Sequence, residues 1–224
     1  MKRAGAINHR SGATLTVTDS LFMNNRAVSV DGGDGATASA INSRSGSSVP
    51  VRHCTFLGNE AIAGDGGVVS DSTKLVGFGC GSAIYNNSST LSVENSTFTN
   101  NRAVGGSGGS GEGAMTTVFY TLDVGAGGAN FIEGTLLLSG STFTGNQAIG
   151  GSNATDATPG IGQVGEAEGG VLVDLGTTAL TNCRFEDKEA QEEAATPGEA
   201  TSVKSAQRSA AASRSRPYRV TTLL

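Results

Sequence analysis

Hydrophobic and polar residues recur along this chain in a pattern built around phenylalanine. Each of four phenylalanines has an asparagine three residues later: Phe22 and Asn25, Phe56 and Asn59, Phe98 and Asn101, and Phe143 and Asn146. An alanine follows each of them by five residues, and aliphatic residues precede each by five and by seven. A fifth, degraded copy centres on Phe185, where Lys188 replaces the asparagine. Copies in fixed register are the signature of a repeat architecture.

Within each copy the apolar residues alternate with period two, which is the spacing of β-strands. Leu15 and Val17 alternate in this way, and Ser20 and Phe22 alternate again after a short break. A third short strand is expected at a step from small to aliphatic residues, which reads Gly5-Ala6-Ile7, Ser39-Ala40-Ile41, Ser82-Ala83-Ile84, Gly127-Gly128-Ala129 and Gly169-Gly170-Val171. Three short strands per copy predict one coil of a parallel β-helix, with coils about 4.8 Å apart.

Equivalent residues of stacked coils should form columns. We expect the phenylalanines and the aliphatic residues to fill the interior. The asparagines should lie at a turn, where this residue tolerates left-handed backbone and its amides bond along the stack. The predicted fold is therefore all-β, a parallel β-helix of about five coils over residues 1–190. Residues 191–224 are predicted to be a disordered basic tail, with a short helix over Lys188–Ala195 at the boundary.

Glycine-rich inserts separate the copies, at about residues 28–39, 62–82, 104–128 and 149–170. All leave the coil at the same corner, so they should build one ridge, where binding is expected. The candidate binding residues on this ridge are Phe119, Tyr120 and Tyr85. The segment Gly105–Gly111 is interpreted as a flexible linker. Met115–Val124 alternates like a strand and is either an extra strand or a binding flap that exposes Tyr120.

The four Phe–Asn pairs, with the steps at Ile7, Ile41 and Ile84, resemble the repeats of the chlamydial polymorphic outer-membrane proteins. They also resemble right-handed parallel β-helix repeats of bacterial surface proteins and autotransporter passengers. The resemblance covers about residues 4–190. It implies a right-handed, pectin lyase-like β-helix, a location at the cell surface, in the outer membrane or outside the cell, and an adhesive role. Function depends on the site and not on the fold alone.

Composition and charge narrow the function classes. The 34 glycines among 224 residues disfavour a helical bundle. The net charge is −5, and the acids gather in the body while the tail is basic, so nucleic acid is not an expected partner. No apolar run is long enough to span a membrane, and the first residues lack the apolar core of a signal peptide. The three cysteines, Cys54, Cys80 and Cys183, suit neither a disulfide framework nor a zinc site, and no cofactor is expected.

An enzyme of the β-helix class, a polysaccharide lyase or glycoside hydrolase, is the alternative. Hydrolysis of a glycosidic bond needs two carboxylates on either side of it. The equivalent positions three residues before each phenylalanine hold no acidic column, since they are Asp19, His53, Asn95, Gly140 and Asn182. Lyases of this fold use a calcium-binding acidic cluster, for which Asp31, Asp34 and Asp65 are the weak candidates.

The leading expectation is a non-catalytic, adhesin-like surface or secreted module that binds a glycan or a surface protein through its inserts. The pattern starts at Gly5 without an atypical first repeat, so its N-terminal edge should be open. Such an edge would pair with further coils or with another copy. We therefore also expect that the chain is a fragment of a longer passenger protein, or that its start codon is wrongly assigned.

Overall fold

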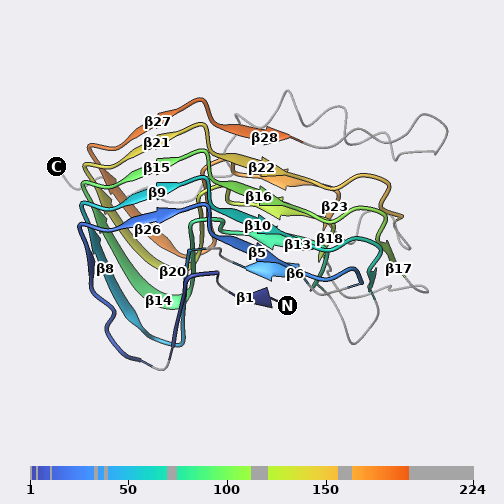
Figure 1. The fold of residues 1–224 in the computed structure, drawn as a ribbon, viewed down its shortest axis with the longest axis horizontal. Helices are drawn as coiled ribbons and strands as arrows, with labels where there is room; N and C mark the ends of the chain where they lie inside the picture. The colour runs from blue at the N-terminus through green and yellow to red at the C-terminus, as the bar shows by residue number, and fades with distance from the viewer. Residues whose placement is uncertain are drawn as a thin grey trace.

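The structure is a computed structural model that describes residues 2–3, 5–10, 12–32, 35–37, 40–69, 75–111, 121–155 and 163–191. Every regular element in these ranges is a β-strand, and the strands pair in parallel within six sheets. The all-β prediction is confirmed. Because each strand pairs with its counterpart in the next repeat, the arrangement is compatible with a solenoid (Figure 1). No helix with the length and apolar character needed to cross a bilayer occurs in the described ranges.

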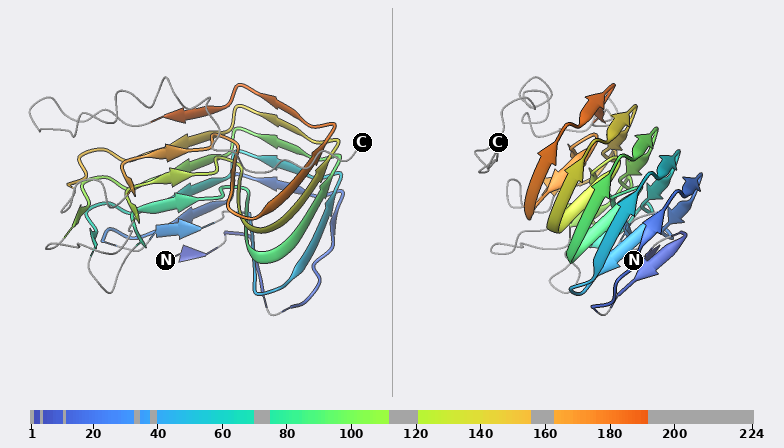
Figure 2. Two further views of the ribbon diagram at one scale, coloured as in Figure 1. Left: turned by 180° about the vertical axis from the view of Figure 1, so that it is seen from behind. Right: turned by 90° about the vertical axis from the view of Figure 1, so that its left-hand side faces the viewer.

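Each repeat contributes a set of body strands. The first and second repeats supply β2 (Ile7–His9), β3 (Val17–Thr18), β4 (Leu21–Met23), β5 (Arg26–Val28), β7 (Ile41–Arg44), β8 (Ser48–Arg52), β9 (Thr55–Leu57) and β10 (Glu60–Ile62). The third and fourth supply β14 (Ile84–Glu94), β15 (Thr97–Thr99), β16 (Arg102–Val104), β20 (Asn130–Ser139), β21 (Thr142–Thr144) and β22 (Gln147–Ile149). The fifth supplies β25 (Leu172–Asp174), β26 (Thr177–Thr181), β27 (Arg184–Glu186) and β28 (Glu189–Gln191). Figure 2 shows these strands as successive layers from the first repeat, in blue, to the fifth, in orange.

The body strands form three sheets. The long sheet contains β2-β7-β14-β20-β25 together with β3, β8 and β26; the Phe sheet is β4-β9-β15-β21-β27; and the Ala sheet is β5-β10-β16-β22-β28. The Ala sheet extends to Gln191, so residues 189–191 form a strand and the helix predicted over Lys188–Ala195 is wrong there. Pairing of Ala190 with Ala148 explains the difference, because the repeat continues past the point where its asparagine is lost.

Two corners separate these three sheets, and both use left-handed backbone. One corner is formed by Asp19, His53, Asn95, Gly140 and Asn182, and the other by Asn24, Gly58, Asn100, Gly145 and Asp187. Their φ angles lie between 46° and 64°, a region that glycine, Asn and Asp enter most easily. The prediction that the asparagine column itself has left-handed backbone is wrong. At the second corner the left-handed residue is the one before each of these asparagines.

The inserts are strands in their own right. Together with β1, which precedes the first repeat, they form a return sheet, β1-β6-β13-β19-β24, and they also form two small sheets, β11-β17 and β12-β18-β23. Their bounds are β1 (Lys2–Arg3), β6 (Gly35–Thr37), β11 (Val68–Val69), β12 (Leu75–Val76), β13 (Phe78–Cys80), β17 (Ser110–Gly111), β18 (Thr121–Leu122), β19 (Gly125–Ala126), β23 (Gln163–Val164) and β24 (Ala167–Glu168). In Figure 1 the small sheets lie at the end opposite β8 and β20.

The segment predicted as a flexible linker is also ordered. Gly105, Gly106 and Gly109 are buried, and their N–H groups donate to the Ile149 carbonyl, the Gly77 carbonyl and the Asp123 carboxylate. The linker interpretation is therefore wrong, because here glycine serves close packing. The same is true where the return sheet meets the Ala sheet. A Cβ at Gly79 would overlap the carbonyl oxygen of Val104.

Among the described residues, three apolar clusters hold these layers together. The main core lies inside the three body sheets and includes the phenylalanine column, whose ring centroids are 4.9, 4.6, 4.5 and 5.0 Å apart along Phe22, Phe56, Phe98, Phe143 and Phe185. A second cluster lies between the long sheet and the return sheet and contains Phe78, Tyr85 and Phe131. A third, around Val69, Val76 and Leu122, packs the small sheets.

An asparagine ladder runs beside the phenylalanines. The Asn101 amide donates to Asn146 Oδ1 (2.8 Å) and to the Phe56 carbonyl (3.1 Å). Its Oδ1 accepts the backbone N–H of Asn59 (3.1 Å) and the Asn59 amide (2.8 Å). Buried polar groups are stable only when they are bonded, and this side chain uses both donors and both acceptor positions.

One column is shifted by a residue from the sequence prediction. Ile84 pairs with Asn130, and Asn130 with Leu172, whereas Ala129 and Val171 had been aligned with Ile84. The correct register follows the left-handed glycines Gly81, Gly127 and Gly169 that precede each step. The predicted alignment is wrong by one residue because a polar residue, Asn130, occupies the position that Ile84 and Leu172 hold in the neighbouring repeats.

Candidate binding surface around Tyr85

Tyr85 is the one candidate binding residue whose position the structure describes. It lies on β14, next to Ile84, which points into the main core. Because side chains alternate along a strand, Tyr85 points the other way, into the second cluster. Its ring stacks on Phe131 at a centroid distance of 5.5 Å, and only 6% of the residue is exposed. The ring is thus a packing element, and only its hydroxyl end is available for polar contacts.

That hydroxyl belongs to a polar group drawn from neighbouring repeats. The Tyr85 hydroxyl donates to Glu133 Oε2 (2.9 Å), and the Asn87 amide donates to the Tyr85 hydroxyl (3.3 Å) and to Glu133. The Arg44 guanidinium carbon lies 4.8 Å from the Tyr85 ring centroid, a cation–π geometry. We call Arg44, Asn87 and Glu133 the polar rim.

The polar rim is one column of the long sheet. Strand register pairs Arg44 with Asn87 and Asn87 with Glu133, and all three side chains are half-buried. They therefore form a short row on a rigid sheet, beside the return sheet of the inserts. A guanidinium, an amide and a carboxylate in a row offer both donors and acceptors, which is the chemistry that binds hydroxyl groups and peptide groups.

The thiol beside this surface is not set up as a nucleophile. Cys80 is fully buried in the second cluster. Burial raises the pKa of its thiol well above the usual value, and Glu133 raises it further, while Arg44 lowers it. Burial also raises the pKa of Tyr85, with smaller increases from Cys80 and Glu133. Both groups stay protonated at neutral pH, so Cys80 supplies no thiolate and Tyr85 contributes a neutral hydroxyl beside the charged side chains of the polar rim.

The other candidate residues lie elsewhere. Phe119, Tyr120 and Asp34 fall outside the described residues, as does most of Met115–Val124 and the tail after Gln191. Asp65 Oδ1 accepts the backbone N–H of Ser107 (2.8 Å), and Asp31 Oδ1 accepts that of Asp65 (3.4 Å). The described carboxylates of the calcium candidates therefore serve the stacking of insert turns. Within the described ranges, no three His, Cys, Asp or Glu residues are grouped to hold a metal ion.

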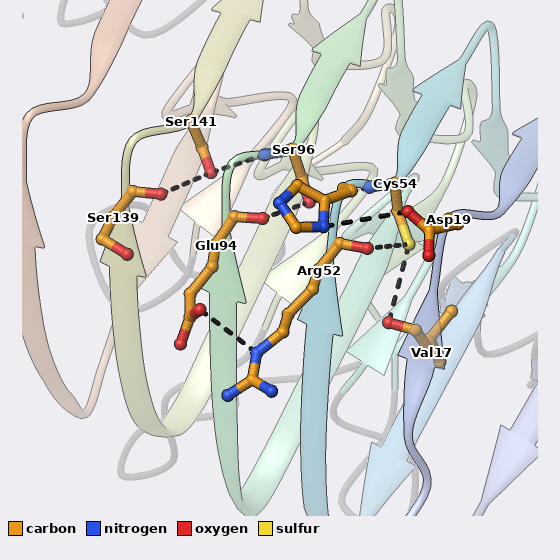
Figure 3. Close-up of polar contacts among 9 residues, drawn as sticks. Val17, Asp19, Arg52, Cys54, Glu94, Ser96, Ser139 and Ser141 are labelled. Atoms are coloured by element: carbon orange, nitrogen blue, oxygen red, sulfur yellow. Dashed lines mark hydrogen bonds and ion pairs between the residues drawn. The ribbon is translucent and has the colours of Figure 1, made fainter.

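A similar ladder lies on the body of the protein (Figure 3). The Ser96 hydroxyl accepts the backbone N–H of Cys54 (3.1 Å), and the Ser141 hydroxyl accepts that of Ser96 (3.1 Å). The Cys54 thiol donates to the Arg52 carbonyl (3.1 Å), so this buried cysteine acts like the serines of its column. On the surface nearby, Arg52 pairs with Glu94 (3.1 Å), and His53 Nδ1 lies 3.8 Å from Asp19 Oδ1.

Asp123 is a buried acid that sequence reasoning missed. Its Oδ2 accepts the Gly109 N–H (2.7 Å), and its Oδ1 has no hydrogen-bond partner among the described residues. Burial raises the pKa of Asp123 to about 6; the Gly109 N–H opposes the shift and Asp65 adds to it. A side chain at Gly77 or Gly109 would overlap this carboxylate. The sequence feature that could have indicated this site is the set of paired glycines in the inserts, which the sequence-based prediction attributes to flexibility.

The sequence pattern also did not reveal the polar rim, because one repeat was aligned one residue out of register. Arg44, Asn87 and Glu133 each lie three residues after the step residues Ile41, Ile84 and Asn130. Alignment of Ala129 with Ile84 moved Glu133 out of this column. Comparison of the chain with protein-family models, with curated proteins and with solved structures gives no match in any of the three.

Proposed function

We propose that this chain is a right-handed parallel β-helix that acts as an adhesin-like module of a cell surface, an outer membrane or the extracellular space. It binds a glycan or a surface protein on its insert side and performs no chemistry. The parallel in-register pairing of equivalent strands supports the fold. The resemblance of the Phe–Asn repeats to those of surface passengers supports the location and the adhesive role.

The polar rim is the observation that carries the binding proposal. Arg44, Asn87 and Glu133 are half-buried, so a ligand that docks there completes their burial and strengthens each polar contact. Their positions on three adjacent strands of one sheet fix their spacing before the ligand arrives. Such preorganisation lowers the entropic cost of binding.

Several described acidic side chains already form ion pairs or hydrogen bonds within the protein, which supports a binding module rather than a hydrolase. Glu60 and Glu94 pair with arginines, and Asp31 and Asp65 accept backbone N–H groups. Glu133 bonds to Tyr85 and Asn87, whereas a glycosidase places a second carboxylate across the scissile bond. Polysaccharide cleavage remains the alternative function and is measured in the same experiment.

The test is a panel of immobilised polysaccharides and surface proteins, scored for both retention and product release. We expect retention on at least one ligand without release of reducing ends or unsaturated sugars. The double variant Arg44→Gln with Glu133→Gln should weaken that retention by about tenfold, since charged hydrogen bonds are lost. Arg52→Gln changes the same residue type away from the rim and should leave retention unchanged.

Two results would count against the proposal. Turnover of any polysaccharide would show that the chain is an enzyme and not a non-catalytic binding module. Equal retention of the rim variant and the parent chain would show that the ligand binds at a surface other than the polar rim. In both cases circular dichroism of each variant must match that of the parent, so that loss of folding is not mistaken for loss of binding.

A further inference from the structure

Among the described residues, the first and last repeats of the stack each have a strand edge with no pairing strand. In the described part of the chain, β4 and β5 pair on one side only, with β9 and β10. At the other end β27 and β28 pair only with β21 and β22 (Figure 1). Edge strands present unpaired N–H and C=O groups, which template pairing with another chain.

We propose that the β27–β28 end of one copy docks on the β4–β5 end of a second copy, in the register that already relates successive repeats. The occupant of each edge is therefore another molecule of this chain. Because the two surfaces differ, the contact is head-to-tail and repeats from copy to copy.

The backbone shapes of the two ends match. The corners at the first end are Asp19 and Asn24, with φ angles of 48° and 54°. The corners at the last end are Asn182 and Asp187, with φ angles of 52° and 46°. The same bends at both ends allow the Phe sheet and the Ala sheet to continue from one copy into the next.

The apolar columns are incomplete at both ends. Phe56, Phe98 and Phe143 are fully buried, but the end residues Phe22 and Phe185 are only partly buried. Leu180 continues the interior column of Val51, Val93 and Leu138 and is 48% exposed. In the proposed register Phe185 stacks on Phe22, and Leu180 lies beside Val17, so docking buries the apolar surface that the stack leaves open.

The polar columns are complementary as well. On the Ala sheet Glu60 pairs with Arg26 (2.9 Å) and Arg102 (3.1 Å), and Gln147 donates to Glu189 (3.0 Å). Continuing this column places Glu189 of one copy beside Arg26 of the next. In the asparagine ladder each Oδ1 accepts the backbone N–H of the preceding repeat. At the junction, the N–H of Lys188 is in the position to donate to Asn25 Oδ1.

The first test is sedimentation velocity of the full 224-residue chain over a concentration series. We expect linear species that lengthen with concentration. Glu189→Arg places two arginines at each junction and should raise the midpoint concentration by roughly threefold to tenfold. Adding Arg26→Glu restores an opposite pair at the junction and should recover assembly, although it also removes the Arg26–Glu60 pair inside each copy. Arg52→Glu disrupts an exposed pair of the same kind inside the stack and serves as the matched control.

The second test reads the register directly by disulfide cross-linking between chains. The background is Cys183→Ser, which removes the one partly exposed cysteine and installs the residue of Ser96 and Ser141. A Val28→Cys chain mixed with a Gln191→Cys chain should form an oxidised heterodimer, because paired parallel strands hold Cα atoms within disulfide range. Arg26→Cys mixed with Gln191→Cys is out of register by two residues and should not cross-link.

The proposal is overturned by a chain that stays monomeric at every concentration. It is also overturned if the charge swap fails to restore assembly, or if Arg52→Glu weakens it as much as Glu189→Arg. Cross-linking of Val28→Cys chains with each other would show head-to-head contact, which the proposed register does not allow.

Discussion

At the residue scale, most polar side chains in the described interior are bonded to the next repeat, and the exceptions are informative. Asn101 makes four hydrogen bonds along its column. Asn130 is equally buried, but in the described part of the chain neither its amide nitrogen nor its Oδ1 has a hydrogen-bond partner. Asp123 is a buried carboxylate to which one described group, the Gly109 N–H, donates. The first of these stabilises the fold, while the other two cost stability.

Asp123 should make stability depend on pH. Its pKa of about 6 in the folded state lies above the ordinary value of 3.8, so the folded state binds more protons between these values. Stability should therefore fall as pH rises from about 4 to about 6 and stay low above that. Asp123→Asn should raise the free energy of unfolding at pH 7 by up to about 3 kcal/mol, with little gain at pH 4.

Denaturant unfolding at a series of pH values measures this effect. Asparagine accepts the left-handed backbone of Asp123, whose φ is 55°. Asp187→Asn makes the same change at an exposed left-handed aspartate and controls for the substitution itself. A larger gain for Asp123→Asn at pH 4 than at pH 7 would contradict the assigned cause.

Replacement of Asn130 by an apolar residue should stabilise the folded protein. Asn130→Leu removes an unbonded buried amide and continues the column of Ile84 and Leu172. We expect the free energy of unfolding to rise by about 1–3 kcal/mol. Asn101→Leu, the same change in the bonded ladder, should instead lower it. Urea denaturation of both variants tests the contrast, and a loss of stability at Asn130 would show that its amide has a partner in solution.

At the element scale, each strand is too short to be stable alone and depends on its equivalents above and below. The Phe sheet illustrates this, since its three inner strands, β9, β15 and β21, have three residues each and place one ring between two others. The Ala sheet and the return sheet show a different solution. There, small residues bring two sheets to backbone contact, as at Gly79 against Val104.

Truncation of an interior ring should cost more than truncation of an end ring. Phe98 is fully buried between Phe56 and Phe143, so Phe98→Ala should lower the free energy of unfolding by about 3–5 kcal/mol. Phe22 stacks on one neighbour and is partly exposed, so Phe22→Ala should cost less. Thermal melts compare the two with Thr97→Ala, an exposed control on the same strand as Phe98. Equal losses at Phe98 and Thr97 would contradict the column.

At the scale of the whole molecule, the repeats build two packed compartments side by side. The body sheets enclose the phenylalanine core, and the inserts fold back as sheets with clusters of their own. The polar rim lies on the long sheet beside the second compartment, and the assembly edges lie at the two ends of the stack. The proposed ligand binding and the proposed head-to-tail contact therefore involve different surfaces and can be tested independently.

The alanines recur in register along the sequence, but the strands that carry them, which form the Ala sheet, are seen only in the structure. The sequence by itself predicted the strands of the long sheet and the Phe sheet, their repetition and the phenylalanines that stack. This was possible because those sheets alternate with period two, and identical residues recur at fixed offsets from each phenylalanine. The inserts could not be understood in the same way. From the sequence alone, their glycines indicate flexible segments. Only the structure shows that these positions require glycine, because the backbones of neighbouring repeats are in contact there.

Tertiary structure alone decided the register of the step at Asn130, the burial of Asp123 and the row formed by Arg44, Asn87 and Glu133. Each depends on which residue of one repeat lies beside which residue of the next. Apolar periodicity reports that alignment only where both partners are apolar. Where a polar residue takes an apolar position, or a loop supplies the neighbour, long-range packing decides, because local sequence carries no record of a contact made forty or more positions away.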